Sequence, residues 1–99
     1  MFEIVYAEGV AHDLGEIRAF DRSNVLDKIE EQLRHEPSRI TRHKKPVVGL
    51  RPPWDHILPV WELRIGEYRV FYDVDDAANV VAVRAVRRKP PHQTTGEIV

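Results

Sequence analysis

The sequence predicts an α+β domain in which two N-terminal helices pack on one face of a small, mostly antiparallel, four-stranded sheet. Two segments between residues 8 and 36 carry apolar residues every three or four positions, as amphipathic helices do. Residues 60–76 and 80–88 instead alternate apolar and polar side chains, as strands do. A chain of 99 residues is long enough for one modest core, so a single domain over residues 1–99 is expected.

The first strand and the first helix occupy residues 2–20. Phe2–Tyr6 alternates and is rich in residues that favour strands, so it predicts a short first strand. A helix is then expected from Glu8 to about Phe20, with one buried stripe formed by Val10, Leu14 and Ile17. Gly15 lies inside this helix and lowers its propensity by roughly 1 kcal/mol relative to Ala.

A second helix is expected to begin at Ser23, which suits an N-cap, and to end before Pro37. It would bury Val25, Leu26, Ile29 and Leu33 and pair with the first helix in antiparallel fashion. Residues 36–59 have no sustained period and contain five prolines, so they predict a long loop. Three of its residues can anchor it to the core: Val48, Leu50 and Trp54.

A β-hairpin over Val60–Asp76 is the element around which the chain is organised. Gly66-Glu67 interrupts the alternation and is expected to form the turn. The period of two gives one apolar set to the face that the helices cover: Trp61, Leu63, Ile65, Tyr68, Val70, Tyr72 and Val74. The opposite face receives Glu62, Arg64, Arg69, Phe71 and Asp73.

The last strand, from Val80 to about Arg88, determines how many bases that opposite face carries. Its longer apolar set is assigned to the core: Val81, Val83 and Ala85. Arg84 and Arg88 then project onto the opposite face, whereas a shift of one residue would send Arg87 and Lys89 there. We expect this face to stay open, because covering unpaired arginines would be costly.

Composition excludes several kinds of site. The chain has no cysteine, so disulfides, thiolate metal sites and cysteine nucleophiles are excluded. No two of its five histidines have the spacing that chelates zinc on a helix, so no metal or other cofactor is expected. The N-terminus lacks the apolar run of a signal peptide or a membrane span, so a cytoplasmic protein without membrane contact is expected.

The net charge of −1 conceals an uneven distribution. Residues 1–36 carry nine acidic and four basic side chains, whereas residues 37–99 carry eleven basic and seven acidic ones. The C-terminal part is therefore the candidate for contact with a polyanion. The residues expected to contact such a polyanion are Lys44, Lys45, Arg51, Phe71, Arg84, Arg87, Lys89 and His92.

The open sheet face is the candidate for chemistry on a phosphodiester. Guanidinium groups such as those of Arg64 and Arg69 donate paired hydrogen bonds to phosphate and stabilise charge in its transition state. Phe71 shares this face and is placed to stack on a base. His92, in the tail beside the basic end of the last strand, is the candidate for proton transfer near neutral pH. The same charges, with Glu62, are equally consistent with a lattice of ion pairs that only covers the sheet.

Three runs of the sequence carry a family resemblance: Lys45–Leu50, Val60–Tyr72 and Val83–Lys89. The strongest likeness lies in Trp61-Glu62-Leu63-Arg64 and Tyr68-Arg69-Val70-Phe71-Tyr72. Together with the order strand, helix pair, three strands, these runs resemble the RelE/ParE superfamily of bacterial toxin–antitoxin toxins. The likeness covers nearly the whole chain and implies the RelE-like fold.

The resemblance implies one of two activities. RelE-like toxins cleave mRNA in the ribosomal A site by attack of the 2′-OH on the scissile phosphate, and ParE-like toxins inhibit DNA gyrase. For a nuclease, the resemblance implies that Arg69 stabilises the transition state and that Arg64 matches a family arginine. It also implies that Arg88, or Lys89 in the shifted register, assists the leaving group. Glu62 is the candidate base. Because Arg69 is expected to project freely, Arg69→Ala should abolish activity with little change in stability.

This sequence also departs from the family pattern. Some family nucleases have two lysines at the positions of Val60 and Glu62, and no tyrosine follows Tyr72, which leaves His92 as the titratable substitute. Three classes therefore stay open: an mRNA endonuclease first, a gyrase inhibitor second, and a catalytically silent antitoxin-binding module third. The expected partners are a cognate antitoxin and either the ribosome with its mRNA or DNA gyrase.

Overall fold

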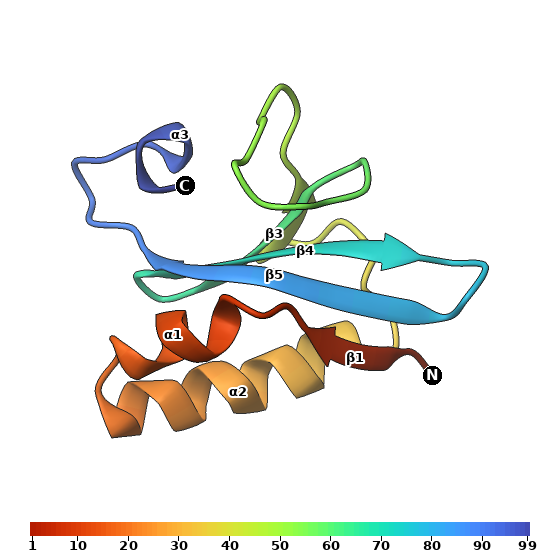
Figure 1. The fold of residues 1–99 in the computed structure, drawn as a ribbon, viewed down its shortest axis with the longest axis horizontal. Coiled ribbons are helices and arrows are strands. Elements are labelled where there is room, and N and C mark those ends of the chain that lie inside the picture. The colour runs from red at the N-terminus through yellow and green to blue at the C-terminus, as the bar shows by residue number, and fades with distance from the viewer.

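The computed structural model describes residues 1–99 and confirms the α+β class. Its elements are β1 (Glu3–Tyr6), α1 (Val10–Gly15), α2 (Ala19–Leu33), β2 (Lys44–Pro46), β3 (Trp61–Ile65), β4 (Tyr68–Asp75), β5 (Val80–Arg88) and α3 (Thr95–Ile98). The strands form one sheet in the order β1-β5-β4-β3-β2, in which only β1 and β5 are parallel. Helices α1 and α2 lie on one side of the sheet, and α3 and the β2–β3 loop on the other (Figure 1). None of the helices combines the length and apolarity needed to cross a bilayer.

The sheet has five strands, and the strand missing from the sequence prediction is β2. It lies inside the expected loop and pairs antiparallel with β3, so that Lys45 faces Glu62. Periodicity does not reveal a strand of three residues, and Pro46 argues against one. Proline is tolerated here because β2 is an edge strand, where a missing N–H leaves no ladder bond unmade.

The two N-terminal helices divide the chain differently from the prediction. Helix α1 ends at Gly15 rather than near Phe20, and α2 begins at Ala19 rather than at Ser23. The Arg22 side chain donates from Nε to the Leu14 carbonyl at 2.8 Å and from Nη2 to the Ile17 carbonyl at 2.9 Å. These bonds satisfy carbonyls where α1 stops, so a short link to α2 suffices.

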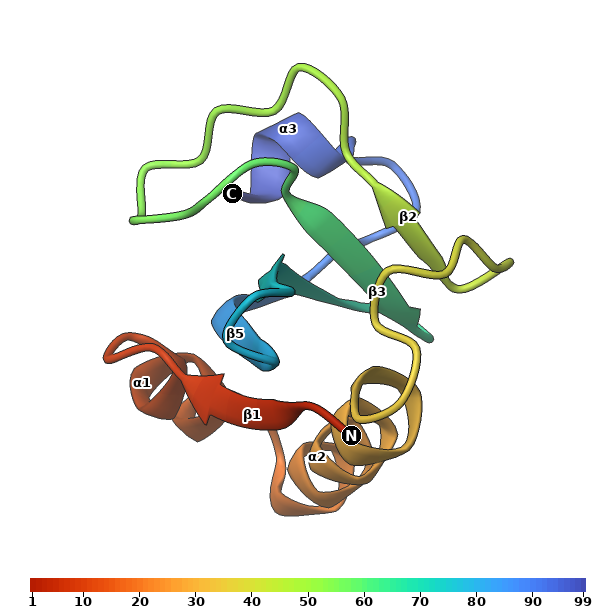
Figure 2. The ribbon, with the colours of Figure 1, turned by 90° about the vertical axis from the view of Figure 1, so that its right-hand side faces the viewer.

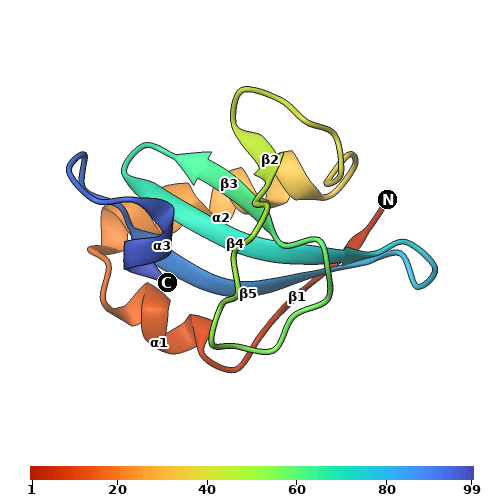
Figure 3. The same ribbon diagram turned by 90° about the horizontal axis from the view of Figure 1, so that it is seen from above.

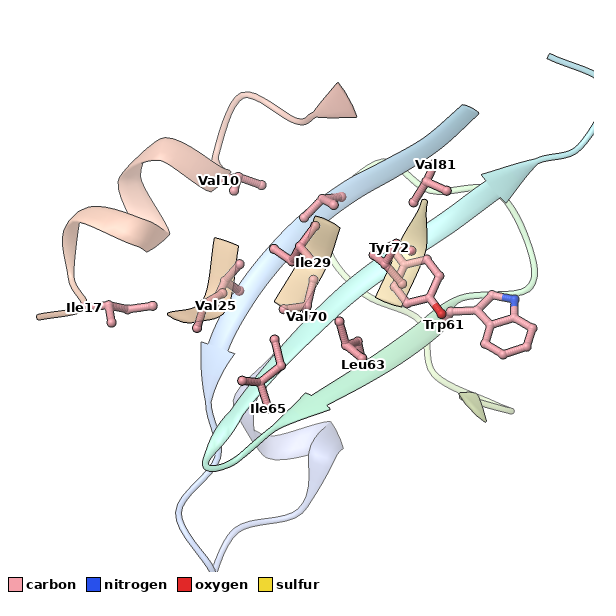
Figure 4. Close-up of a cluster of buried hydrophobic side chains, with 13 residues drawn as sticks. Val10, Ile17, Val25, Ile29, Trp61, Leu63, Ile65, Val70, Tyr72 and Val81 are labelled. Atoms are coloured by element: carbon pink, nitrogen blue, oxygen red, sulfur yellow. The ribbon is translucent and has the colours of Figure 1, made fainter. Parts of the chain in front are cut away.

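The main core lies between the sheet and α1 and α2 (Figure 4). As the alternation predicted, β3 and β4 supply Trp61, Leu63, Ile65, Val70 and Tyr72, and α2 supplies Val25, Ile29 and Leu33. Tyr72 is fully buried, and its hydroxyl donates a 2.7 Å hydrogen bond to the Pro37 carbonyl. Each large apolar side chain buried here contributes about 1.5–3 kcal/mol, which fixes the register of the hairpin.

The opposite face of the sheet is partly covered, contrary to the expectation of an open face. Val60, Phe71 and Ala85 form a second buried cluster there. Leu50 and Trp54 of the β2–β3 loop and Ile98 and Val99 at the C-terminus pack against this cluster. Figure 3 shows the loop and α3 crossing this face. Three apolar side chains on the outward face are thus removed from water by segments that carry no periodic signal.

A β-bulge in β5 resolves the choice between the two registers of that strand. Phe71 pairs with Ala85 while Tyr72 pairs with Val83, so Arg84 is the extra residue. Before the bulge the expected register is confirmed, since Val81 and Val83 lie in the main core and Arg84 lies outward. After the bulge the strand follows the shifted register, with Val86 in the main core and Arg87 outward. Arg88 therefore pairs with Tyr68 on the helix side, and the expectation that it projects onto the opposite face is wrong.

Candidate nucleic-acid interface

A row of arginines crosses three adjacent strands on the outward face of the sheet. Arg64 of β3 pairs with Arg69 of β4, and Arg69 in turn pairs with Arg87 of β5. Like charges in directly opposed positions destabilise a sheet. Two of the three are compensated by acids, Arg69 by Glu62 and Arg87 by Asp13, which leaves Arg64 as the uncompensated cation of the row.

A cavity of about 240 Å³ lies beside this row, and we call it the basic cleft. Its lining residues come from four separate parts of the chain: Arg42, His43, Lys45, Glu62, Arg64, Arg69, Lys89 and Thr95. Five of these side chains are basic and one is acidic. Four of the bases make no ion pair within the chain: Arg42, Lys45, Arg64 and Lys89. The cleft therefore carries a positive charge that the protein does not neutralise.

The Glu62–Arg69 pair is the buried part of the basic cleft. Glu62 is 5% exposed and Arg69 is 6% exposed, and Arg69 Nε lies 3.6 Å from Glu62 Oε1. Arg69 Nη1 donates to the carbonyls of Gly66 and Tyr68 at 2.8 and 2.9 Å. Burial lowers the pKa of Arg69, and the Glu62 carboxylate opposes this shift. A guanidinium stays protonated at any physiological pH. Arg69 is therefore a cation that its hydrogen bonds and Glu62 hold in one position.

Helix α3 borders the basic cleft and touches its one acid. Thr95 Oγ1 donates to Glu62 Oε2 at 3.0 Å. The helix is a single turn closed by a capping box, in which the Thr94 N–H donates to Glu97 Oε1 at 2.8 Å. These hydrogen bonds from Thr94 hold the pKa of Glu97 below its ordinary value. Figure 2 shows α3 on the same side of the sheet as the loop that follows β2.

The basic cleft unites five residues that the sequence proposed for catalysis or RNA binding: Lys45, Glu62, Arg64, Arg69 and Lys89. Arg84 and Arg87 share the outward face but are engaged elsewhere. Arg84 Nε donates to Asp73 Oδ2 at 2.8 Å, and Arg87 Nη1 donates to Asp13 Oδ2 at 2.7 Å. The Arg87 guanidinium also lies 5.3 Å from the ring centroid of Trp54. Arg87 thereby holds the sheet to α1 and to the covering loop, and Arg84 joins β5 to β4.

Three of the proposed site residues are not positioned for the roles expected of them. Lys44 is 4% exposed, and its Nζ donates to the Gln32 and Glu36 carbonyls at 3.0 and 2.8 Å, where it closes the end of α2. Arg88 lies on the helix side with its Nη2 3.1 Å from Glu67 Oε2. Phe71 is fully buried in the second cluster and has no face free for a base.

The remaining two proposed residues, Arg51 and His92, are exposed and do not line the basic cleft. Conversely, the sequence prediction overlooked Arg42, His43 and Thr95, which do line it. Arg42 and His43 directly precede Lys44-Lys45, and this uninterrupted basic run was the signal that could have identified them. Thr95 carries no such signal, because only the path of the tail brings it to Glu62.

Comparison with known proteins assigns this arrangement to a family. A model of the ParE toxin family, described as the toxin of the type II toxin–antitoxin system parDE, matches residues 4–89. The match takes in both N-terminal helices and, apart from the first residue of β1, the whole sheet. Comparison with curated protein sequences finds no match.

Solved structures with the same fold come from toxin–antitoxin systems. The RelBE2 complex of Mycobacterium tuberculosis matches with 22% identity and a TM-score of 0.69 over 89% of this chain and 98% of that one. The isolated RelE toxin of E. coli matches with 18% identity and a TM-score of 0.69 over 98% and 94%. The RelE–RelB complex of Pyrococcus horikoshii OT3 matches with 20% identity and a TM-score of 0.65 over 94% and 98%. At these identities the likeness establishes the fold.

Proposed function

Because the chain belongs to the ParE toxin family of type II toxin–antitoxin systems, we propose that it is a toxin that acts by cleaving mRNA on the ribosome. One observation carries this proposal: four unpaired cations surround a buried, fixed Glu62–Arg69 pair in one cleft. A phosphodiester is the ligand that such a cleft suits, since it brings one negative charge per nucleotide. The solved RelE structures support the proposal through the shared fold.

In the proposed reaction the 2′-OH of one nucleotide attacks the adjacent phosphorus. The P–O5′ bond breaks, and the products are a 2′,3′-cyclic phosphate and a 5′-OH. The His43 imidazole lines the cleft and takes the 2′-OH proton, because an imidazole nitrogen with a free lone pair is the commonest general base in proteins. Arg64 and Arg69 stabilise the charge on the phosphorane, and Lys89 donates a proton or a hydrogen bond to the leaving oxygen.

The proposed role of Glu62 is to position Arg69, in place of the role as base that the family resemblance implied. Its two oxygens already face Arg69 Nε and the Thr95 hydroxyl. Arg69 Nη1 is bound to two carbonyls, while Nη2 has no partner in the chain and is available to a phosphate oxygen. A donor fixed before substrate arrives loses little freedom on binding, which is the usual source of transition-state stabilisation.

A second candidate function is inhibition of DNA gyrase, the activity that the resemblance to ParE-like toxins implies, and the matching family model is that of the ParE toxins. An inhibitor of this kind acts by docking on a protein and needs exposed apolar side chains rather than catalytic groups. The β2–β3 loop offers three of them: Val48, Ile57 and Leu58, which are 94%, 44% and 77% exposed. This candidate assigns no role to the unpaired cations of the basic cleft, so we place it second.

The cognate partner that we propose is an antitoxin with an acidic segment that covers the basic cleft in the resting complex. Charge complementarity supports it, because the cleft holds four cations without an internal acidic partner. In the solved RelBE structures the toxin is held in a complex with its antitoxin.

The function is tested by adding the purified protein to a translating cell extract and mapping the ends of the mRNA. We expect new fragments with 5′-OH ends at codons occupied by ribosomes, and none with Arg64→Ala. The same preparation is assayed in parallel for gyrase supercoiling and for trapped DNA breaks. Intact mRNA together with trapped breaks would replace the first candidate with the second.

A further inference from the structure

We propose that a second cavity next to the basic cleft extends it into a track for single-stranded RNA, in which α2 contacts the nucleotides flanking the scissile phosphate. This cavity, the edge cleft, lies between α2 and the β3 end of the sheet. It is lined by Asn24, Lys28, Gln32, Arg42, His43, Leu63, Arg64, Ile65 and Gly66. The inference rests on the proposed function, because the basic cleft must hold the reacting phosphate.

The two clefts share three lining residues. Arg42, His43 and Arg64 line both of them, so a chain lying against these three side chains passes from one cleft into the other. The edge cleft has a volume of about 580 Å³, within the range of roughly 300–1,000 Å³ that is usual for ligand sites. The basic cleft by itself is smaller, at about 240 Å³. The shared residues thus connect a reaction site to a larger space with no acidic lining.

The lining of the edge cleft matches the parts of a nucleotide. Lys28 supplies a cation, and its pair with Glu31 at 3.1 Å leaves both side chains about half exposed, so a phosphate replaces the glutamate at little cost. Asn24 and Gln32 lie eight residues apart along α2, and each amide offers both donors and an acceptor. Such amides form paired hydrogen bonds with the edges of bases, which also present both donors and acceptors. Phosphates present acceptors alone and do not need such a partner.

The same lining disfavours an acidic peptide as the occupant. Peptides that dock in grooves are anchored by apolar side chains inserted into apolar pockets. The edge cleft has two apolar residues, Leu63 and Ile65, and these are 1% and 8% exposed because they face the main core. Because the cleft has no accessible apolar pocket for an anchoring side chain, it suits a polar, anionic chain with flat hydrogen-bonding edges.

The first test measures binding without cleavage. Fluorescent 2′-O-methyl RNA lacks the attacking hydroxyl, so its affinity for the full-length protein is read by anisotropy over a series of salt concentrations. For an octanucleotide, Lys28→Ala should reduce the slope of log K against log salt by about 0.7, the value for one phosphate contact on a single strand. Binding of a dinucleotide, which occupies the basic cleft alone, should be unchanged.

The control is Arg18→Ala. Arg18, the N-cap of α2, is likewise a base with an acidic partner three residues on, but it lines neither cleft. It should leave the slope unchanged. Equal slopes for Lys28→Ala and the parent protein would overturn the track. So would a Lys28→Ala effect on the binding of an octaglutamate peptide with no effect on RNA.

The second test separates the track from the chemistry. The double variant Asn24→Ala/Gln32→Ala is added to a translating extract, and the bases flanking its cleavage sites are counted. We expect a relaxed base preference at one flanking position, together with slower cleavage at the sites that the parent prefers. An unchanged preference together with unchanged octanucleotide affinity would overturn base contact by α2. If the parent cleaves nothing while Lys28→Ala still lowers the slope, the proposed reaction fails and the track stands.

Discussion

At the scale of single residues, the main consequence of the structure concerns Arg69. The sequence pattern suggested a side chain projecting freely, but Arg69 is buried against Glu62 and two carbonyls. Removing one partner of a buried ion pair leaves the other charge without compensation. Arg69→Ala therefore removes a structural contact as well as a candidate catalytic group, and Arg64 becomes the residue at which chemistry can be tested without unfolding.

Arg69→Ala should lower the free energy of unfolding by about 3–5 kcal/mol, because Glu62 is then buried without its cation. Arg64→Ala should change it by less than about 0.5 kcal/mol, since Arg64 is exposed and makes no ion pair. Denaturant unfolding followed by circular dichroism measures both. Equal midpoints for the two variants would show that the buried pair contributes nothing to the fold.

Lys44 and Lys45 are adjacent in sequence and opposite in role. Lys44→Met should cost about 1–3 kcal/mol of stability, because the Gln32 and Glu36 carbonyls lose their donor. It should leave the salt dependence of RNA binding unchanged. Lys45→Met should do the reverse, since Lys45 is exposed and lines the basic cleft. Thermal melts and salt titrations of the two variants check this, and a common behaviour of both would contradict it.

At the scale of elements, helix α3 depends on one carboxylate. Folding lowers the pKa of Glu97, so the ionised form stabilises the helix and its contribution is complete above the ordinary value of 4.5. That contribution is lost as the pH falls below 4.5 and through the folded-state pKa. The amide signals of residues 94–98 should therefore shift in NMR spectra of the parent protein as the pH falls below 4.5, with a midpoint below that value.

The control for this titration is Glu97→Gln, which should show the low-pH spectrum at every pH in the range. Because Glu97 is fully exposed, the effect is expected to be confined to α3 and to leave the main core folded. A Glu97 titration centred on the ordinary value would contradict the capping box as the origin of the shift.

The elements also show which features of the fold a sequence pattern can predict and which it cannot. The hairpin faces were predicted in full, because alternation over Trp61–Ile65 and Tyr68–Tyr72 leaves only one face for the core. The bulge at Arg84 was not predicted, since one extra residue in a strand changes no local preference and only alters the register of the residues after it. The start of α2 was also missed, because the bonds from Arg22 that permit a short link are tertiary contacts.

At the scale of the whole molecule, the candidate site is assembled from segments far apart in sequence. The loop before β2 supplies Arg42 and His43, the hairpin supplies Glu62 and Arg69, and the tail supplies Thr95. Alternation identified the hairpin residues, but no local pattern indicates which loop and which tail cover a sheet face. The charge excess of residues 37–99 pointed to the correct half of the chain, and the fold determined which bases meet.

The most direct test of the central claim is the rate at which a programmed ribosome loses intact mRNA in the A site when the toxin is added in excess. Loss of one donor to the transition state costs about 10²- to 10³-fold in rate, so Arg64→Ala should slow cleavage by that factor. Arg51→Ala, an exposed base outside the basic cleft, should cleave at the parental rate. Equal rates for all three proteins, or no cleavage by any of them, would contradict a catalytic basic cleft.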